Sequence, residues 1–105
     1  MENEIVKVFE SKDFGKIRTA IVNNEPWFVG KDVASCLAYK DTSDALKKHV
    51  DNEDKGVAKI DTSGEKRNVI IINESGLYHL LMRSEKMSAS KKQAFITSLQ
   101  KEGYL

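Results

Sequence analysis

Basic and hydroxyl side chains gather near the middle of the chain, and their types suit contacts with phosphate groups. Lys40, Lys47 and Lys48 flank the neighbouring pair Thr42 and Ser43. Ammonium groups can neutralise phosphates, and hydroxyl groups near a helix start can hydrogen-bond to phosphate oxygens or base edges. The same residues would also suit an ordinary surface helix that is capped and solvated. Both interpretations remain open at the level of the residues.

Further basic residues lie outside this central segment and are candidates for contacts with a phosphate backbone. One begins a predicted helix, two occupy the tip of a predicted hairpin, and the rest surround a connection between predicted helices. Basic side chains on a hairpin tip can straddle phosphates as a wing, although solubility alone would also explain them. These residues are Lys31, Lys66, Arg67, Arg83, Lys86, Lys91 and Lys92.

The sequence patterns do not indicate an enzyme or a metal site. His49 and His79 lack any ligand spacing, and Cys36, the single cysteine, cannot form an intrachain disulfide. The segment around Ser75 lacks the Gly-x-Ser-x-Gly arrangement of a nucleophilic serine. The acidic run at 51–54 lacks the pattern of a calcium loop, so we expect it to supply turn and cap contacts. We therefore predict no catalytic residue, no metal and no cofactor.

The totals predict one folded domain over residues 1–105. Hydrophobic residues make up 40% of the chain and only one proline is present, which excludes a disordered tail. No membrane span, secretory signal or second domain is recognisable, so we expect a cytoplasmic location in a bacterial host or an infected cell. The net charge of +1 does not by itself indicate a nucleic-acid binder. Residues 83–102 nevertheless hold five basic and two acidic residues, which predicts one basic face.

Hydrophobic spacing in the first half predicts a small antiparallel sheet followed by two short helices. Segments 5–9, 17–22 and 26–29 should be strands, with a tight turn at Asn23-Asn24. Trp27 and Phe28 should then point to opposite faces, as core residues. A helix of about two turns should start near Lys31 and bury Val33, Ala34, Leu37 and Ala38 on one side. The next helix should begin within 41–44 and bury Ala45, Leu46 and Val50.

The second half repeats the order of hairpin and then helices. A hairpin should pair 57–60 with 68–72 around a turn at 62–64, and Asn73-Glu74-Ser75 should start a third helix. A last helix over 88–102 should end at Gly103 and turn Ala94, Phe95 and Leu99 inward. The predicted fold class is thus α+β, with two β-hairpins, short helices between them and two C-terminal helices.

Several blocks of sequence, in this order and at this spacing, resemble the N-terminal domain of the BRO family. Together they span roughly residues 9 to 84, and their combination is specific although each block alone is weak. The end of the chain keeps Gly103-Tyr104 but lacks the family's preceding tryptophan and Leu-Pro-x-Ile-Arg stretch. The blocks are EPWFVGKDVA (25–34), LAYK (37–40), DAL (44–46), HV (49–50), DKG (54–56) and INESGLY (72–78).

The resemblance implies a non-catalytic regulator of the phage or prophage type. BRO-type N-terminal domains occur in prophage antirepressors and in proteins of large insect DNA viruses, and they are regarded as DNA-binding modules. We therefore expect double-stranded DNA as the partner, with the hydroxyl and basic residues above as its contacts. A homodimer is compatible with a short module of modest charge, because pairing adds affinity. The alternative is a protein-interaction module that binds a phage repressor protein without contacting DNA.

Overall fold

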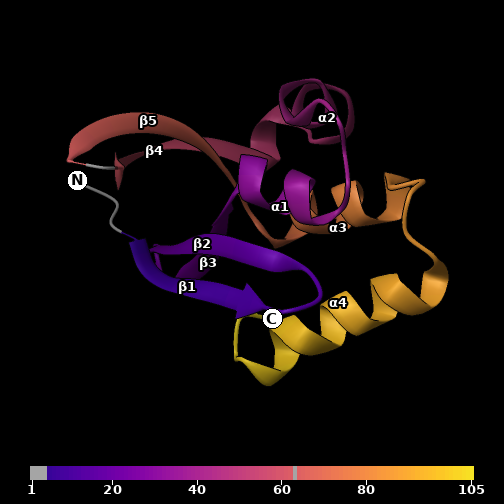
Figure 1. Ribbon diagram of the computed structural model, residues 1–105. Helices are drawn as coiled ribbons and strands as arrows, with labels where there is room; N and C mark the ends of the chain where they lie inside the picture. The colour runs from indigo at the N-terminus through magenta and orange to yellow at the C-terminus, as the bar shows by residue number, and fades with distance from the viewer. Residues whose placement is uncertain (1–4, 63) are drawn as a thin grey trace.

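The framework of the fold is one antiparallel sheet. Over residues 5–62 and 64–105, which the computed structural model describes, five strands pair in the order β1-β2-β3-β5-β4 (Figure 1). Ser63, which belongs to the predicted turn at 62–64, lies outside the described residues. The strands are β1 (Ile5–Ser11), β2 (Gly15–Val22), β3 (Glu25–Val29), β4 (Lys55–Thr62) and β5 (Glu65–Ile72).

Four α-helices cover one face of this sheet. Their buried side chains form the larger hydrophobic core together with Phe28 of β3 and Ile72 of β5. No helix in the described part of the chain is both long and apolar enough to cross a membrane. The helices are α1 (Gly30–Cys36), α2 (Thr42–His49), α3 (Glu74–Arg83) and α4 (Ala89–Lys101), and a short 3-10 turn, η1 (Asn52–Asp54), precedes β4.

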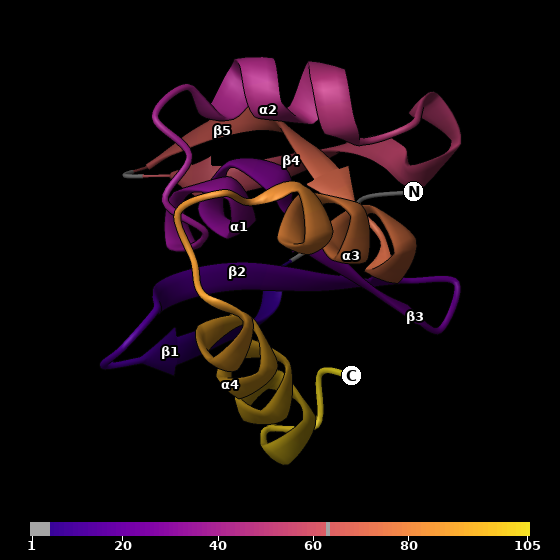
Figure 2. The same cartoon turned by 90° about the vertical axis from the view of Figure 1, so that its right-hand side faces the viewer.

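The last helix stands apart from the other three. In Figure 2, α4 lies below β2 while α1, α2 and α3 lie above it. Two fully buried side chains, Phe95 and Leu99, anchor α4 in the core. Phe95 and Leu99 are four positions apart, so they form one narrow apolar stripe on the helix. The ring of Phe14 meets the ring of Phe95 edge-on, with 5.2 Å between the ring centroids. The turn between β1 and β2 therefore holds α4 in place.

A second, smaller core lies on the opposite face of the sheet. Neighbouring residues of a strand point to opposite faces, so Phe28 joins the larger core while Trp27 and Val29 join the smaller one. The sheet bends enough for the β4–β5 hairpin to arch over β2 and β3 (Figure 1). The two predicted hairpins thus share one sheet, joined by the pairs Phe28↔Ile72 and Val29↔Ile71.

The local predictions from turn and cap residues are confirmed. Asn23 and Asn24 both adopt positive φ, 50° and 64°, as a tight hairpin turn requires. The side chains of Asp41, Asn73 and Ser88 accept hydrogen bonds from backbone N–H groups in the first turns of α2, α3 and α4. The α+β class and the order of elements follow the expectation from sequence.

Two inward-facing predictions are wrong. Ala38 lies beyond the end of α1, is exposed, and has a left-handed φ of 68°. The chain leaves the helix there, so helical spacing no longer sets the direction of the side chain. Ala94 is also exposed, because α4 buries only the stripe of Phe95 and Leu99 and Ala94 lies beside it.

The connection between β3 and α1 leaves a gap in the sheet that a side chain fills. Strand β3 stops at Val29. Beyond the pair Thr19↔Phe28, β2 therefore still pairs with β1 on one edge but no longer pairs with β3 on the other. The carboxylate of Asp32 accepts a hydrogen bond from the backbone N–H of Arg18 at 2.9 Å, in place of a strand. Its two oxygens also accept hydrogen bonds from the guanidinium of Arg18 at 2.8 and 2.9 Å, which raises the pKa of Arg18.

The turn into α1 requires a glycine. A Cβ atom on Gly30 would lie 2.9 Å from Cδ2 of Leu46 and 3.4 Å from the carbonyl oxygen of Ile70. The carbonyl oxygen would be in ordinary contact, so a larger residue would mainly displace the end of the Leu46 side chain from its place in the core. Gly30 and Asp32 therefore fix the same corner of the fold from two sides.

We predict that replacing Asp32 destabilises the protein far more than replacing an exposed aspartate. Asp32→Ala leaves a part-buried guanidinium and a backbone N–H without their acceptor, which should cost about 3 kcal/mol in the free energy of unfolding. Asp44→Ala removes only the exposed pair with Lys48 (3.1 Å) and should cost less than about 1 kcal/mol. Urea unfolding of both variants measures the difference, and equal losses would contradict the role given to Asp32.

We also predict that the thiol of Cys36 alkylates slowly near neutral pH. Burial, and then the charge of Asp32, raise the pKa of Cys36 to about 11. At pH 8 the thiolate fraction should be about two hundredfold below that of a free cysteine with a pKa of about 8.5. The rate of iodoacetamide labelling of the folded protein should climb until about pH 11. A labelling rate that levels off just above about pH 8.5, the ordinary pKa of a free cysteine, would show that the thiol is not shielded.

Candidate nucleic-acid interface

Several predicted contact residues come together in a cleft where β3 gives way to α1. Its volume is about 460 Å³, and its walls are the first turns of α1 and α2, the middle of β5 and one residue of β2. Lys31, Thr42, Ser43 and Arg67 were all expected from sequence, and the fold places them together. The full lining is Arg18, Val29, Lys31, Thr42, Ser43, Leu46, Arg67, Asn68, Val69 and Ile70.

Each of these side chains is held by a specific local feature. The Oδ1 atom of Asp41 accepts a hydrogen bond from the backbone N–H of Asp44 at 3.0 Å, which fixes Thr42 and Ser43 in the first turn of α2. Lys31 follows the glycine that turns the chain out of β3. Arg67 lies on β5 opposite Ile60, two residues after the strand begins, so it faces the cleft instead of projecting from the hairpin tip.

The lining of this cleft is positively charged. It contains three cationic residues and no acidic residue. Arg18 is engaged with Asp32, and Arg67 lies 3.4 Å from Glu65 at an exposed position where such a pair contributes little. Lys31 is exposed, and no ion pair is found for it among the described residues. The cleft therefore offers at least two cations that an anion could approach from solvent.

A second cleft collects other predicted residues on a different part of the molecule. Its volume is about 390 Å³, and it includes Lys40, Arg83 and Lys86 together with one acidic residue, Glu85. The hydroxyl of Tyr39 donates to the carbonyl of Leu80, and that of Ser84 to the carbonyl of Leu37, at 2.8 and 3.0 Å. These bonds join the loop after α1 to the end of α3. A third cleft, of about 400 Å³, adjoins it through Lys86 and adds Lys91 and Asp13.

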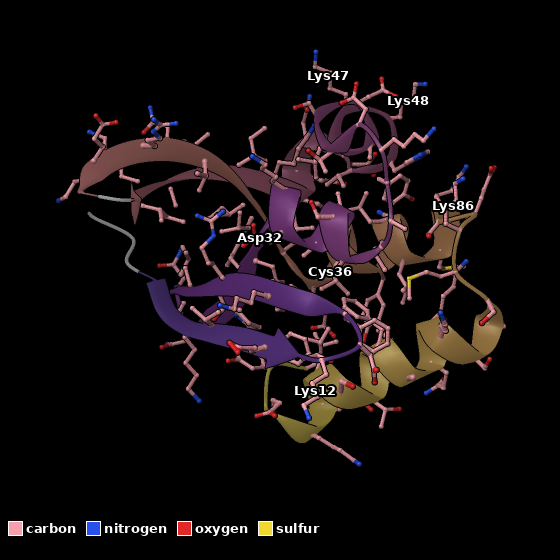
Figure 3. All side chains as sticks on the ribbon, in the orientation of Figure 1. Lys12, Asp32, Cys36, Lys47, Lys48 and Lys86 are labelled. Carbon is pink, nitrogen blue, oxygen red and sulfur yellow. The ribbon has the colours of Figure 1, made fainter. Side chains whose placement is uncertain are left out.

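The remaining predicted residues line none of these three clefts. Lys47 and Lys48 project from α2 into solvent, as Figure 3 shows, and Lys48 pairs with Asp44 on the same helix. Lys66 is exposed on β5, and the ammonium group of Lys92 lies 3.4 Å from the carbonyl oxygen of Met82. The structure thus divides the predicted contacts between the first cleft, the adjoining second and third clefts, and four residues outside them, where the sequence suggested a single face.

Two residues of the first cleft were absent from the sequence-based candidates. In the sequence, Arg18 is simply one position within the predicted strand 17–22, and Asn68 begins the predicted strand 68–72. The signal for Arg18 was its charge within a strand whose neighbours, Ile17 and Thr19, are buried. Pairing it with Asp32 required the tertiary fold, because the two residues are joined through separate elements.

The acidic run forms the expected turn, η1, but none of its side chains caps that turn, and one member is buried. Asp54 is 8% exposed, and its carboxylate accepts hydrogen bonds from Nδ2 of Asn73 and Oγ of Ser75, both at 3.2 Å. Asp51 and His79 place ligand atoms within 4.8 Å of it, a proximity that their spacing in sequence does not reveal. Because both oxygens of Asp54 already accept hydrogen bonds at the start of α3, the group is explained as part of the fold.

The chain matches a family model described as the BRO family, N-terminal domain, over residues 16–102. The putative Bro-N domain-containing proteins 289L and 201R of Invertebrate iridescent virus 6 are 39% and 33% identical to it. Their alignments, of 88 and 101 residues, cover 67% and 77% of this chain. An uncharacterized protein of Haemophilus influenzae is 31% identical over 99 residues, which cover 91% of this chain. No solved structure matches the chain significantly.

The match to the family model reaches further toward the C-terminus than the recognised sequence blocks. The alignments with the three relatives, in contrast, span less than half of each relative's length. The family match reaches residue 102 and so takes in α4, beyond the 9–84 range of the recognised blocks. The aligned regions make up 21%, 24% and 48% of the three relatives. Since the family model covers most of the residues from β2 to the end of α4, this chain belongs to the BRO family and contains its N-terminal domain.

Proposed function

We propose that this protein is a non-catalytic DNA-binding domain of a phage or prophage-type transcriptional regulator. The observation that carries the proposal is the first cleft, where Lys31 and Arg67 flank Thr42 and Ser43 and no acidic residue lines the wall. Cations beside hydroxyl groups at a helix start are suited to phosphate oxygens. The partner is double-stranded DNA.

The arrangement of the elements around this cleft supports the proposal of a duplex as partner. Helix α2 lies on the outside of the molecule, and the β4–β5 hairpin extends to one side of it (Figure 1). A helix beside a hairpin is a recurrent arrangement for groove and backbone contacts. Lys47 and Lys48 extend outward from the same helix, and Lys86 lies farther along that side of the molecule in Figure 3. These three residues would contact phosphates on either side of the groove.

The charges also limit the strength of this binding. Asp41 and Asp44 lie at the start of α2, and Glu85 lies beside Lys86 in the second cleft. Such acids repel phosphates, so only a few of the basic residues can engage the backbone at once. Binding should therefore be weak for one copy of the domain and steeply sensitive to salt.

We predict that removing the two cations of the first cleft flattens the salt dependence of DNA binding. For the full chain, log affinity for a duplex should fall linearly with log salt concentration. The double variant Lys31→Ala, Arg67→Ala should lower the slope by about two at most, since each lost phosphate contact removes about one counterion. Fluorescence anisotropy with a labelled duplex between about 20 and 200 mM salt measures the slope.

A matched control removes the same charge elsewhere. Lys12 lies on the opposite side from α2 in Figure 3, and Lys101 is exposed at the end of α4. The double variant Lys12→Ala, Lys101→Ala should keep the original slope within error. If the control and the cleft variant lose affinity equally, or if the chain fails to bind duplex in dilute buffer, the proposed function is wrong.

A further inference from the structure

A duplex held by the rim of the first cleft would leave the interior of the cleft unused. The lining also includes four aliphatic residues. Leu46 belongs to the larger core, and Ile70 lies on that face of β5, whereas Val29 and Val69 belong to the smaller core on the opposite face. A volume of about 460 Å³ can admit a narrow ligand, but it is too small for a double helix. The interior of the cleft and the strand that borders it are therefore available for another ligand.

The bordering strand, β5, has an open edge in this cleft. Strand β3 pairs with β5 only through Phe28↔Ile72 and Val29↔Ile71, and then the chain turns into α1. Residues 65–70 of β5 consequently pair with β4 on one side, and no strand among the described residues pairs with them on the other. A strand edge of this kind presents backbone N–H and C=O groups that another strand can join.

The matching edge of β2 is closed, which makes the contrast informative. There the carboxylate of Asp32 accepts the hydrogen bond from the backbone N–H of Arg18. No side-chain cap of this type is found for the backbone of residues 67–70 in the described part of the chain. The fold thus seals one side of the gap left by β3 and keeps the other side open.

We propose that the open edge of β5 receives an extended acidic segment of a partner polypeptide, which adds to the sheet as a further strand. Its backbone would pair with residues 65–70, in the direction that β3 would have continued. Alternate side chains of a strand point to opposite sides, so apolar ones would lie on the face of Ile70 and Leu46 while acidic ones would lie on the face of Arg67, within the same cleft as Lys31. The absence of acidic residues from the lining matches this charge.

The proposed segment would regulate DNA binding. It uses Lys31 and Arg67, the same two cations that we assign to duplex phosphates, so the two partners would compete. The competition rests on the proposed function, whereas the strand addition itself does not. An acidic segment in the cleft would thus release the domain from DNA without any change of fold.

Synthetic peptides test the strand addition directly. The probe is a labelled, capped hexapeptide of alternating aspartate and valine, and its anisotropy is followed with the full chain at low salt. The probe should bind, and binding should slow the hydrogen exchange of backbone amides within residues 65–70. Lys31→Ala, Arg67→Ala should weaken binding by about tenfold or more, while Lys12→Ala, Lys101→Ala should leave it unchanged.

Two altered peptides separate strand addition from simple charge attraction. Methylation of alternate backbone nitrogens removes the donors that face β5 but keeps every charge, so binding should fall by about tenfold or more. A peptide with lysine in place of aspartate should not bind. Equal binding of the methylated or the lysine peptide would overturn the proposal.

A competition experiment distinguishes this proposal from the DNA-binding proposal. Saturating the chain with the acidic peptide should release a labelled duplex, and the methylated peptide should not. Duplex that stays bound to a peptide-saturated chain would refute the shared cleft. A chain that binds the peptide but no duplex in dilute buffer would refute the proposed function and support the strand addition alone.

Discussion

One interaction on which the fold depends is the pairing of Asp32 with Arg18. There a side-chain carboxylate accepts the backbone hydrogen bond that a neighbouring strand would otherwise accept. Strand β3 ends at Val29, where α1 begins, so the edge of β2 has no pairing with β3 beyond Thr19. A part-buried backbone donor without a partner is costly, and a single carboxylate satisfies that donor together with the guanidinium beside it. The turn at Gly30 and the open cleft next to β5 both follow from this arrangement.

The sequence blocks that mark the family perform mostly structural work. Phe28 fills the larger core, Gly30 permits the approach of α2, and Asp32 closes the edge of β2. Asn73 caps α3 and also holds the buried carboxylate of Asp54. These blocks therefore report how the chain folds, and they say little about what it binds. An argument about the ligand has to rest on the surface residues between and beside the blocks.

The same distinction explains what the sequence could and could not predict. Turns and caps depend on a few neighbouring residues, so Asn23-Asn24 and the N-cap of α2 were readable directly. The pairing of β3 with β5 joins residues more than forty positions apart, and periodicity carries no information about such contacts. Ala94 shows the limit within one helix, because its apolar character indicated burial although the partner surface reaches only the neighbouring stripe. The distribution of the basic residues between separate clefts also depends on contacts between distant elements, so the spacing of those residues in the sequence does not reveal it.

Near-neutral charge makes the position of each charge more important than the total. The chain carries 17 basic and 16 acidic residues, so its field at long range is small, and screening over about 10 Å at 0.1 M salt weakens it further. An anionic partner would therefore respond mainly to local groups such as the lining of the first cleft, where cations occur without acids. The two partners that we propose, a duplex and an extended acidic polypeptide, would both use Lys31 and Arg67 of that lining. Because those two cations can be neutralised by only one of them at a time, local charge would make the two partners alternatives.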